Sequence, residues 1–161
     1  MDGGGEAQGD GQAMPGPRVV TEGEFAGWST WSGQDAFEDM TGPFLFREHT
    51  DGSVRCAFRA AAKHMNGGGF MHGGCLLTFA DFCLFAVSHP ARVRAGRDGP
   101  AVTVSLNGEF VGPARAGELI EAAGEVVRMG ASLLFVRGLV VTGPRPLLNF
   151  SGVVKQVRRR G

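Results

Sequence analysis

Residues 66–74 have the sequence NGGGFMHGG and lead directly into residues 75–88, CLLTFADFCLFAVS. The second stretch carries one charged side chain, Asp81, among residues that are apolar on every helical face. A helix that is apolar all round is expected to be buried on all sides, and a carboxylate in it must be paired, neutral or used in chemistry. We therefore predict a reactive site at the start of a buried helix, about residues 74–88.

The length and charge of the chain exclude several classes of function. With 161 residues it has room for one domain whose core is stable without cross-links. Its 16 basic and 16 acidic residues cancel, so no overall field would attract nucleic acid or an anionic membrane. The longest apolar run is shorter than the ~20 residues that span a bilayer, and the N-terminus lacks a signal pattern. We expect neither nucleic acid nor a membrane as a partner.

Potential metal and phosphate ligands follow no familiar spacing. The chain has three cysteines, Cys56, Cys75 and Cys83. They form neither a zinc ribbon nor a secreted disulfide scaffold, so we expect a cytoplasmic protein. His64, His72 and Asp81 match no common metal-ligand pair, and no GK[ST] follows the glycine run at 67–69. We predict no metal and no cofactor.

Composition divides the chain into four segments. Residues 1–17 are Gly-rich and are expected to form a disordered tail. Residues 18–42 place aromatic rings among polar residues, which predicts an N-terminal cover over the core, with a lid over a substrate pocket as the alternative. Residues 43–157 form a single domain, and residues 158–161 form a basic C-terminal tail.

The pattern after residue 43 is typical of an antiparallel sheet. Asp51-Gly52 lies between two alternating runs and predicts a hairpin. The helix is expected to end before Pro90, with a basic turn at 91–99. Four β-rich runs follow, at about residues 101–110, 118–129, 132–142 and 147–157. Their breakers are too short for parallel crossovers, so we predict an α+β fold in which a curled antiparallel sheet wraps one long helix.

Several motifs match one known family. The matching residues are Asn66, His72, Gly73, Gly74 and Asp81, in the pattern N-x5-HGG-x6-D, followed by VTVSLN at 102–107 and GPARAGE at 112–118. Together they resemble the hotdog-fold acyl-CoA thioesterases of the PaaI-like and acyl-CoA thioesterase 13-like group, over residues 43–157. The resemblance implies a hotdog fold, hydrolysis of acyl-CoA to a free acid and coenzyme A, and assembly as a dimer of dimers.

Thioester hydrolysis needs donors for the carbonyl oxygen and a group that activates water. The Gly73 N–H, at the first turn of the helix, lacks an internal partner and lies at the positive end of the helix dipole. The Asn66 amide is a second donor. Asp81 follows Gly73 by eight residues, about 12 Å along a helix, which is too far for both to act on one carbonyl. Antiparallel helices from two chains would join them, so we predict a homodimer or homotetramer.

The resemblance also implies roles for individual residues. Asp81 activates water or attacks directly, and Thr103 helps to hold the water. His72 either holds the turn through a hydrogen bond or transfers a proton. Predicted substrate-binding residues are Gly74, Phe82, Phe85, Arg128 and Gly130. Candidate cations for the coenzyme A phosphates are Arg92, Arg94, Arg97, Arg128, Lys155 and Arg158 to Arg160, although Ala131 stands where the family often carries Lys.

Other interpretations stay open at the level of the sequence. Asp81 is alternatively a structural partner for an N–H or an Arg, and Cys75 is either a nucleophile at the helix start or a small packed residue. The alternative function is a non-catalytic hotdog module that binds acyl-CoA or acyl groups as a sensor. A hotdog dehydratase would pair a catalytic His with its acid in a different motif. Aromatic, medium and long acyl groups all fit the sequence.

Overall fold

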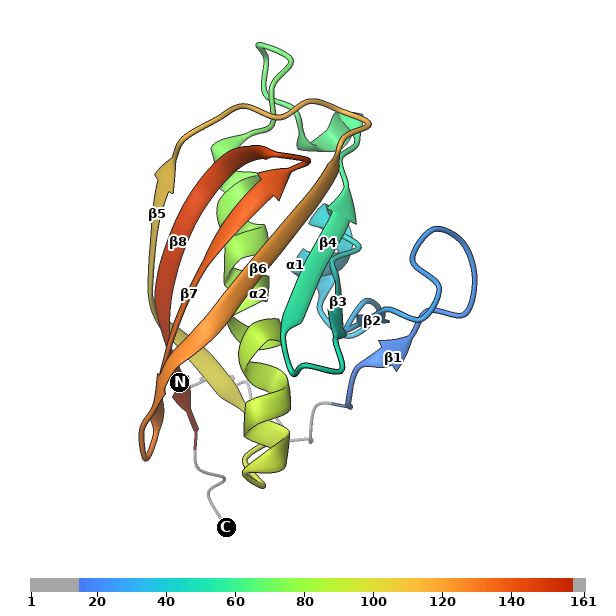
Figure 1. The fold of residues 1–161 in the computed structure, drawn as a ribbon. Helices are drawn as coiled ribbons and strands as arrows, with labels where there is room; N and C mark the ends of the chain where they lie inside the picture. The colour runs from blue at the N-terminus through green and yellow to red at the C-terminus, as the bar shows by residue number, and fades with distance from the viewer. Residues whose placement is uncertain (1–14, 158–161) are drawn as a thin grey trace, which may run out of the picture.

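A curled antiparallel sheet wraps one long helix in the computed structural model, which describes residues 15–157 (Figure 1). The strands are β1 Arg18–Val19, β2 Ser29–Thr30, β3 Leu45–Glu48, β4 Val54–Arg59, β5 Ala101–Phe110, β6 Leu119–Met129, β7 Leu133–Thr142 and β8 Arg145–Gln156. The helices are α1 Ala36–Thr41, the 3-10 turn η1 Ala62–His64, and the central helix α2 Gly73–Arg94. The predicted fold class is confirmed. Most of the predicted N-terminal tail, and the C-terminal tail, lie outside the described residues.

The eight strands follow the order β1-β2-β3-β4-β6-β7-β8-β5, and every pair is antiparallel. The hairpin predicted at Asp51-Gly52 joins β3 to β4; Asp51 accepts a hydrogen bond from the Ser53 N–H, and Gly52 supplies a φ of +82°. The last strand begins at Arg145 rather than residue 147, because Gly143-Pro144 alone completes the turn. Strand β5 lies at one edge of the sheet, so one side of its backbone is unpaired.

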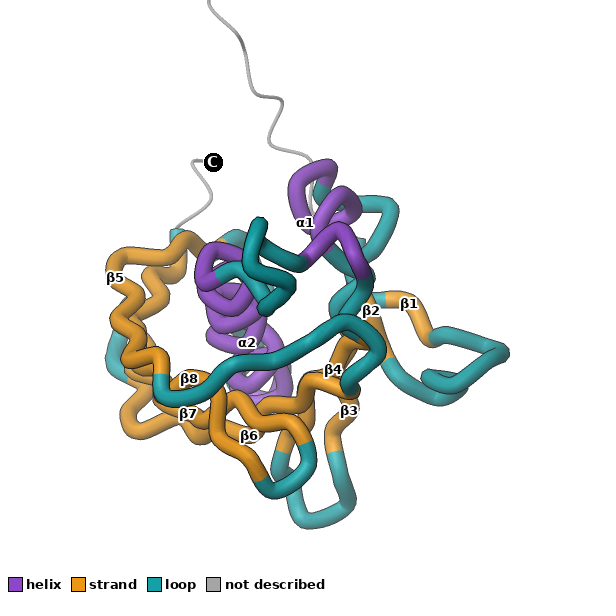
Figure 2. Tube along the Cα trace, turned by 90° about the horizontal axis from the view of Figure 1, so that it is seen from above, coloured by secondary structure: helices purple, strands orange, loops and turns teal. Residues whose placement is uncertain are grey.

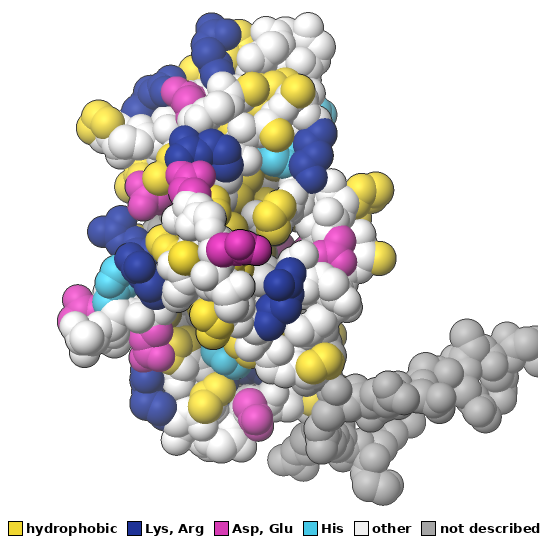
Figure 3. All heavy atoms as spheres, turned by 90° about the vertical axis from the view of Figure 1, so that its right-hand side faces the viewer, with side chains coloured by type: hydrophobic (Ala, Val, Ile, Leu, Met, Phe, Trp, Pro, Cys, Tyr) yellow, Lys and Arg dark blue, Asp and Glu magenta, His cyan; other side chains and the backbone are white. Residues whose placement is uncertain are grey.

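The core lies between α2 and the concave face of the sheet. Buried side chains of β8, such as Leu148, Phe150 and Val154, alternate with outward residues and face the helix. Gly152 lets the helix approach, because a Cβ there would lie 2.5 Å from the Leu84 side chain. On the surface seen in Figure 3, acidic and basic side chains are interspersed.

The predicted end of the central helix before Pro90 is wrong. Helix α2 continues through Pro90 to Arg94, so the basic turn begins only at Ala95. A proline inside a helix forfeits one backbone hydrogen bond and costs ~3 kcal/mol. Here Pro90 is buried, and the next turn is held by the Ala95 N–H donating to the Ala91 carbonyl. At 22 residues α2 reaches the length and apolarity of a membrane span, a property that buried core helices share.

The expectation that α2 is covered on all sides is also wrong for the single chain. Residues at helical spacing along one side are exposed or half-buried, namely Gly74, Thr78, Asp81 and Phe85. We call these four residues the open face of α2. Viewed from above, the strands curl round the opposite side of α2 and α1 lies beside its uncovered side (Figure 2). Asp81 therefore escapes full burial because the sheet does not reach round the helix.

Trp31 anchors the N-terminal segment to the core. Its ring stacks on Phe46 at 4.7 Å and meets the edges of Phe82 and His89, both at 5.5 Å between ring centroids. Such aromatic pairs contribute about 0.5–1.5 kcal/mol each beyond the area they bury. The segment therefore holds α1 in place next to α2.

Candidate active site

The start of α2 is organised by the His72 side chain. His72 is the N-cap residue, and its Nδ1 accepts a hydrogen bond from the Gly74 N–H at 2.9 Å. An imidazole nitrogen that accepts carries no proton, so this contact fixes the ring in its Nε2-protonated tautomer. Of the two predicted roles for His72, the contact supports the structural one, which is to hold the turn. It also occupies the N–H of Gly74, a residue that the sequence predicts to bind substrate.

The Gly73 N–H is left as a free donor. It makes no hydrogen bond within residues 15–157, whereas its neighbours donate to His64, His72 and other groups. As the first residue of a 22-residue helix it lies at the positive end of the helix dipole. A free amide in that field is suited to bind an oxygen that gains negative charge.

The Asn66 side chain folds the glycine loop. Its Oδ1 accepts from the N–H groups of Gly68 and Phe70 at 2.8 and 3.3 Å, and Gly69 adopts a φ of +75°. Because both partners are donors, the atom that faces them is the oxygen, and the Nδ2 amide stays available to donate elsewhere. The loop is thus a hydrogen-bonded turn that presents Asn66 beside the helix start.

Asp81 is positioned by strand β5. Thr103 Oγ1 donates to Asp81 Oδ1 at 2.6 Å, a charge-assisted hydrogen bond. The register of β5 against β8 shifts between Thr103 and Ser105, which leaves Val104 as the extra residue of a β-bulge. Bulges re-aim neighbouring side chains and are frequent beside active sites. The bulge next to Thr103 therefore helps to turn its hydroxyl toward the open face of α2.

The two halves of the predicted site lie apart within one chain. Gly73 and Asp81 are separated by two turns of α2, about 12 Å of helix rise. The bridge between Met65 and Met71 brings Asn66 to the same end of α2 as Gly73, and the Thr103 hydroxyl contacts Asp81. Within one chain these two pairs lie apart, which agrees with the separation predicted from the sequence.

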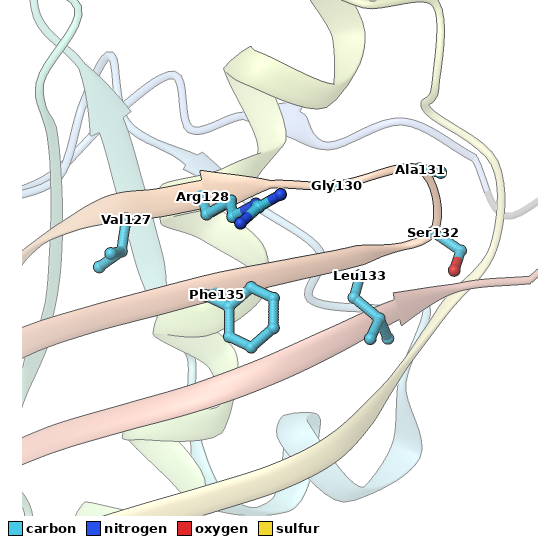
Figure 4. Close-up of a pocket in the computed structure, with 7 residues that line it drawn as sticks. All are labelled: Val127, Arg128, Gly130, Ala131, Ser132, Leu133 and Phe135. Carbon is cyan, nitrogen blue, oxygen red and sulfur yellow. The ribbon is translucent and has the colours of Figure 1, made fainter.

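The predicted substrate-binding residues fall in three places. Phe82 is 1% exposed and packs among core aromatic rings, whereas Phe85 is half-buried on the open face. Arg128 and Gly130 line a hollow of about 550 Å³ beside the β6–β7 turn, on the side of the sheet away from α2 (Figure 4). This turn lies near the C-terminal end of α2, about 30 Å from Gly73. Within one chain Arg128 and Gly130 are therefore remote from the free amide.

Most of the candidate cations in the described residues already have partners. Arg92 is buried and donates to the Gly99 carbonyl, and Arg94 pairs with Glu48. Arg97 donates to the carbonyls of Gly130 and Ala131, so it lies at the same turn as Arg128. Arg158 to Arg160 lie outside the described residues.

Cys75 is not set up as a nucleophile. Burial raises the pKa of its thiol to about 11, so the thiol is neutral near pH 7. The thiolate is the reactive form, and no imidazole hydrogen-bonds this sulfur among the described residues. The structure favours the alternative of a small packed residue.

Glu38 is a site neighbour that sequence reasoning missed. Burial, followed by the carboxylates of Asp35, Asp81 and Asp39, raises the pKa of Glu38 to about 7. Its proximity to Asp81 results from the packing of α1 against α2, which no local pattern reveals. In the sequence, Glu38 is one of three neighbouring acids, with Asp35 and Asp39, and carries no distinguishing signal.

A free amide at the helix start and a hydrogen-bonded carboxylate on the same central helix, inside a curled sheet, are groups suited to a thioester hydrolase of the hotdog class. Residues 68–148 match the family model described as the thioesterase superfamily. The match covers half of the chain, and the chain therefore belongs to the thioesterase superfamily.

Relatives and solved structures agree with this assignment. A Pseudomonas aeruginosa protein assigned as an esterase is 34% identical over 115 residues, 71% of this chain and 84% of that protein. Human acyl-coenzyme A thioesterase 13 is 30% identical over 99 residues, 62% of this chain and 68% of that protein. A variant of the phenylacetic acid degradation protein PaaI from Thermus thermophilus superposes with a TM-score of 0.63 at 26% identity, covering 76% of this chain and 100% of that one.

Proposed function

We propose that this thioester hydrolase acts on acyl-CoA, with each active site built from two copies of the chain. The observation that carries the proposal is the Thr103–Asp81 hydrogen bond on the open face of α2, two helical turns from a free Gly73 amide. The names of acyl-coenzyme A thioesterase 13 and of solved relatives bound to coenzyme A or acetyl-CoA support the choice of substrate.

In the proposed mechanism, the Gly73 N–H and the Asn66 Nδ2 donate to the thioester oxygen. The hydrogen bonds from both donors strengthen as negative charge builds on that oxygen. They therefore stabilise the transition state more than the bound substrate, which lowers the barrier. Neither donor must first break a hydrogen bond within the described residues. Such an arrangement is preorganised, since its dipoles point at the reacting atom before the reaction begins.

Asp81 and Thr103 position and activate the attacking water. The Thr103 hydroxyl donates to Asp81 Oδ1, so its lone pairs remain free to accept from a water molecule. Asp81 Oδ2 makes no hydrogen bond within residues 15–157 and is free to take a proton. As the water oxygen bonds to the carbonyl carbon, its proton passes to Asp81. The C–S bond then breaks, and Asp81 returns that proton to the sulfur, so coenzyme A leaves as the thiol. Direct attack by Asp81 is the alternative, in which water hydrolyses the resulting anhydride.

The proposed assembly pairs strand β5 of one chain with β5 of another. This strand is ten residues long, lies at the sheet edge, and exposes Val102 and Val104 to 49% and 57%. A long edge strand with apolar side chains is a ready template for pairing. A two-fold axis through that pairing would lay the two α2 helices side by side in antiparallel sense. Gly73 would then approach Asp81 of the partner subunit, giving two equivalent sites.

The proposal is tested with a panel of acyl-CoA thioesters and a thiol-reactive dye that reports free coenzyme A. We expect turnover on at least part of the panel by the purified chain, with size-exclusion chromatography coupled to light scattering giving a dimer or tetramer. An active monomer would overturn the shared site, and absence of thiol release on every acyl-CoA would overturn the substrate.

A further inference from the structure

A groove runs between α1 and the first turns of α2. Its volume is about 510 Å³, within the ~300–1,000 Å³ typical of small-ligand sites. One wall carries the large apolar side chains of Phe37 and Met40, and the opposite wall carries the smaller Cys75 and Thr78. Gly74, next to the free amide of Gly73, is also part of its lining. The groove is therefore continuous with the proposed oxyanion site.

Two other directions away from Gly73 are blocked within the chain, and the open face of α2 is the side that the partner helix would cover. Towards the sheet, Leu76 and Phe79 are buried and fill the core. Towards β5, the ring of Phe110 lies 3.2 Å from the position of a Cβ on Gly73, and one turn later the Leu77 side chain packs against Gly108. The acyl group is covalently attached to the carbonyl held at Gly73. Within the chain, the space beneath α1 is the route that remains for it.

Charge decides which end of the substrate enters the groove. The segment that forms its outer wall contains Asp35, Glu38 and Asp39, whose negative potential disfavours the phosphates of coenzyme A. Lys63, on the rim, already donates to the carbonyls of Met40 and Gly42. The groove thus offers apolar contact and no free cation among the described residues that line it.

The two large apolar side chains on α1 are unusually exposed. Phe37 is 57% exposed and Met40 is 67% exposed, although both line the groove. Contact with an apolar ligand would bury them, and a flexible Met side chain adapts readily to an alkyl chain. None of the six side chains of α1 is buried, so its apolar side chains are available to contact a ligand.

From this geometry we infer that the groove holds the acyl group of the substrate, an uncharged apolar group, and that α1 sets the chain length accepted. The inference rests on the proposed hydrolysis of acyl-CoA. Phe37 and Met40 are specificity-determining residues that touch the acyl chain without taking part in the chemistry.

The first test measures kcat/KM on acetyl-, octanoyl- and dodecanoyl-CoA. Met40→Trp, which fills the groove from an exposed position, should lower the value for dodecanoyl-CoA at least about tenfold and leave acetyl-CoA within about twofold. Phe37→Trp should act in the same direction. Met129→Trp, at the exposed end of β6, serves as the control and should keep the wild-type profile. Unchanged chain-length profiles in both α1 variants would overturn the inference.

The second test does not depend on turnover. Cys75 is the one half-buried cysteine in the chain, because Cys56 and Cys83 are buried, so a maleimide in excess at alkaline pH should label it selectively, at a slow rate set by its thiol pKa of about 11. Saturating dodecyl-CoA, a thioether that cannot be hydrolysed, should slow labelling at least about fivefold, whereas coenzyme A alone should not. Equal labelling rates with both probes would overturn the groove assignment. Failure of all acyl-CoAs to release thiol, with protection intact, would overturn only the hydrolysis.

Discussion

The two halves of the active site are built in different ways. The helix start is organised by contacts within about nine residues: His72 caps Gly74, and Asn66 closes the glycine loop. The Asp81 half depends on a contact between residues 22 positions apart, made by a hydroxyl on a bulged strand. The donors are thus fixed by local geometry, whereas the water-activating group is fixed by the tertiary fold. Substitutions in the two halves should therefore have different effects on kcat.

The largest effect is expected at Asp81. Asp81→Asn keeps the shape of the side chain and still accepts from Thr103, but it removes the charge that takes up a proton. We expect kcat to fall about 10³-fold, within the range for loss of a general base. Thermal unfolding and oligomer size should stay near wild type, since asparagine has the same shape and keeps the hydrogen bond from Thr103. Retention of more than a tenth of the activity would show that Asp81 does not act in the reaction.

The next largest effect is expected at Gly73. Gly73→Pro deletes the free N–H at the first helical position, where proline is well tolerated. His72 already has the extended backbone that must precede a proline, with φ −66° and ψ 133°. We expect kcat to fall about 10²-fold.

Gly73→Ala is the matched control for that loss. It keeps the N–H and adds a Cβ that presses on the same Phe110 ring. The ratio of kcat between the alanine and proline variants therefore isolates the hydrogen-bond donor. Equal activity of the two variants would show that the amide does not bind the oxyanion.

A smaller effect is expected at Thr103. Thr103→Ala removes the donor to Asp81 Oδ1 and leaves the carboxylate free to rotate, so we expect kcat to fall about tenfold, in line with the ~1.5–3 kcal/mol of a hydrogen bond to a charged group. Thr103→Ser keeps the hydroxyl and should recover most of the rate. A serine variant as slow as the alanine variant would point to strand packing rather than to the hydroxyl. The readout is kcat at saturating acyl-CoA.

The smallest effect concerns the pH dependence of α1 packing. Folding raises the pKa of Glu38 from 4.5 to about 7, so its contribution to stability is complete below pH 4.5 and is lost as the pH rises through 7. Glu38→Gln should remove this dependence and stabilise the protein at pH 8 by about 1 kcal/mol, after discounting for solvent screening of a half-buried carboxyl. The free energy of unfolding, measured with denaturant at pH 5 and pH 8, tests this expectation. Glu22→Gln, on the exposed part of the same segment, is the control and should change neither value.

The same distinction between local contacts and contacts made by the tertiary fold explains what the sequence could predict. The helix start and the hairpin at Asp51-Gly52 are encoded within a few residues, and both were predicted correctly. The end of α2 was not, because Pro90 is buried in the folded chain, and this burial offsets its local preference to end a helix. An all-apolar helix has no periodicity that distinguishes a core residue such as Phe82 from an open-face residue such as Phe85.

The contacts of the Asp81 half could be predicted from the sequence only in part. Thr103 was named through the family resemblance, but the bulge at Val104 beside it has no signature in the sequence. Likewise, α1 could be recognised as an aromatic cover, while the groove beneath it and the approach of Glu38 to Asp81 depend on how α1 docks. Residues joined across elements require the register of the strands and the position of the helices.

The central claim, that each site takes Gly73 from one chain and Asp81 from the other, is tested most directly by complementation. Asp81→Asn and Gly73→Pro chains, each nearly inactive alone, are co-expressed in equal amounts with different affinity tags. Half of the resulting dimers are hybrids, and each hybrid has one intact site, so the mixture should recover about a quarter of wild-type kcat. The hybrid purified through both tags should recover about half. Activity of the purified hybrid no higher than that of its parents would contradict a shared site.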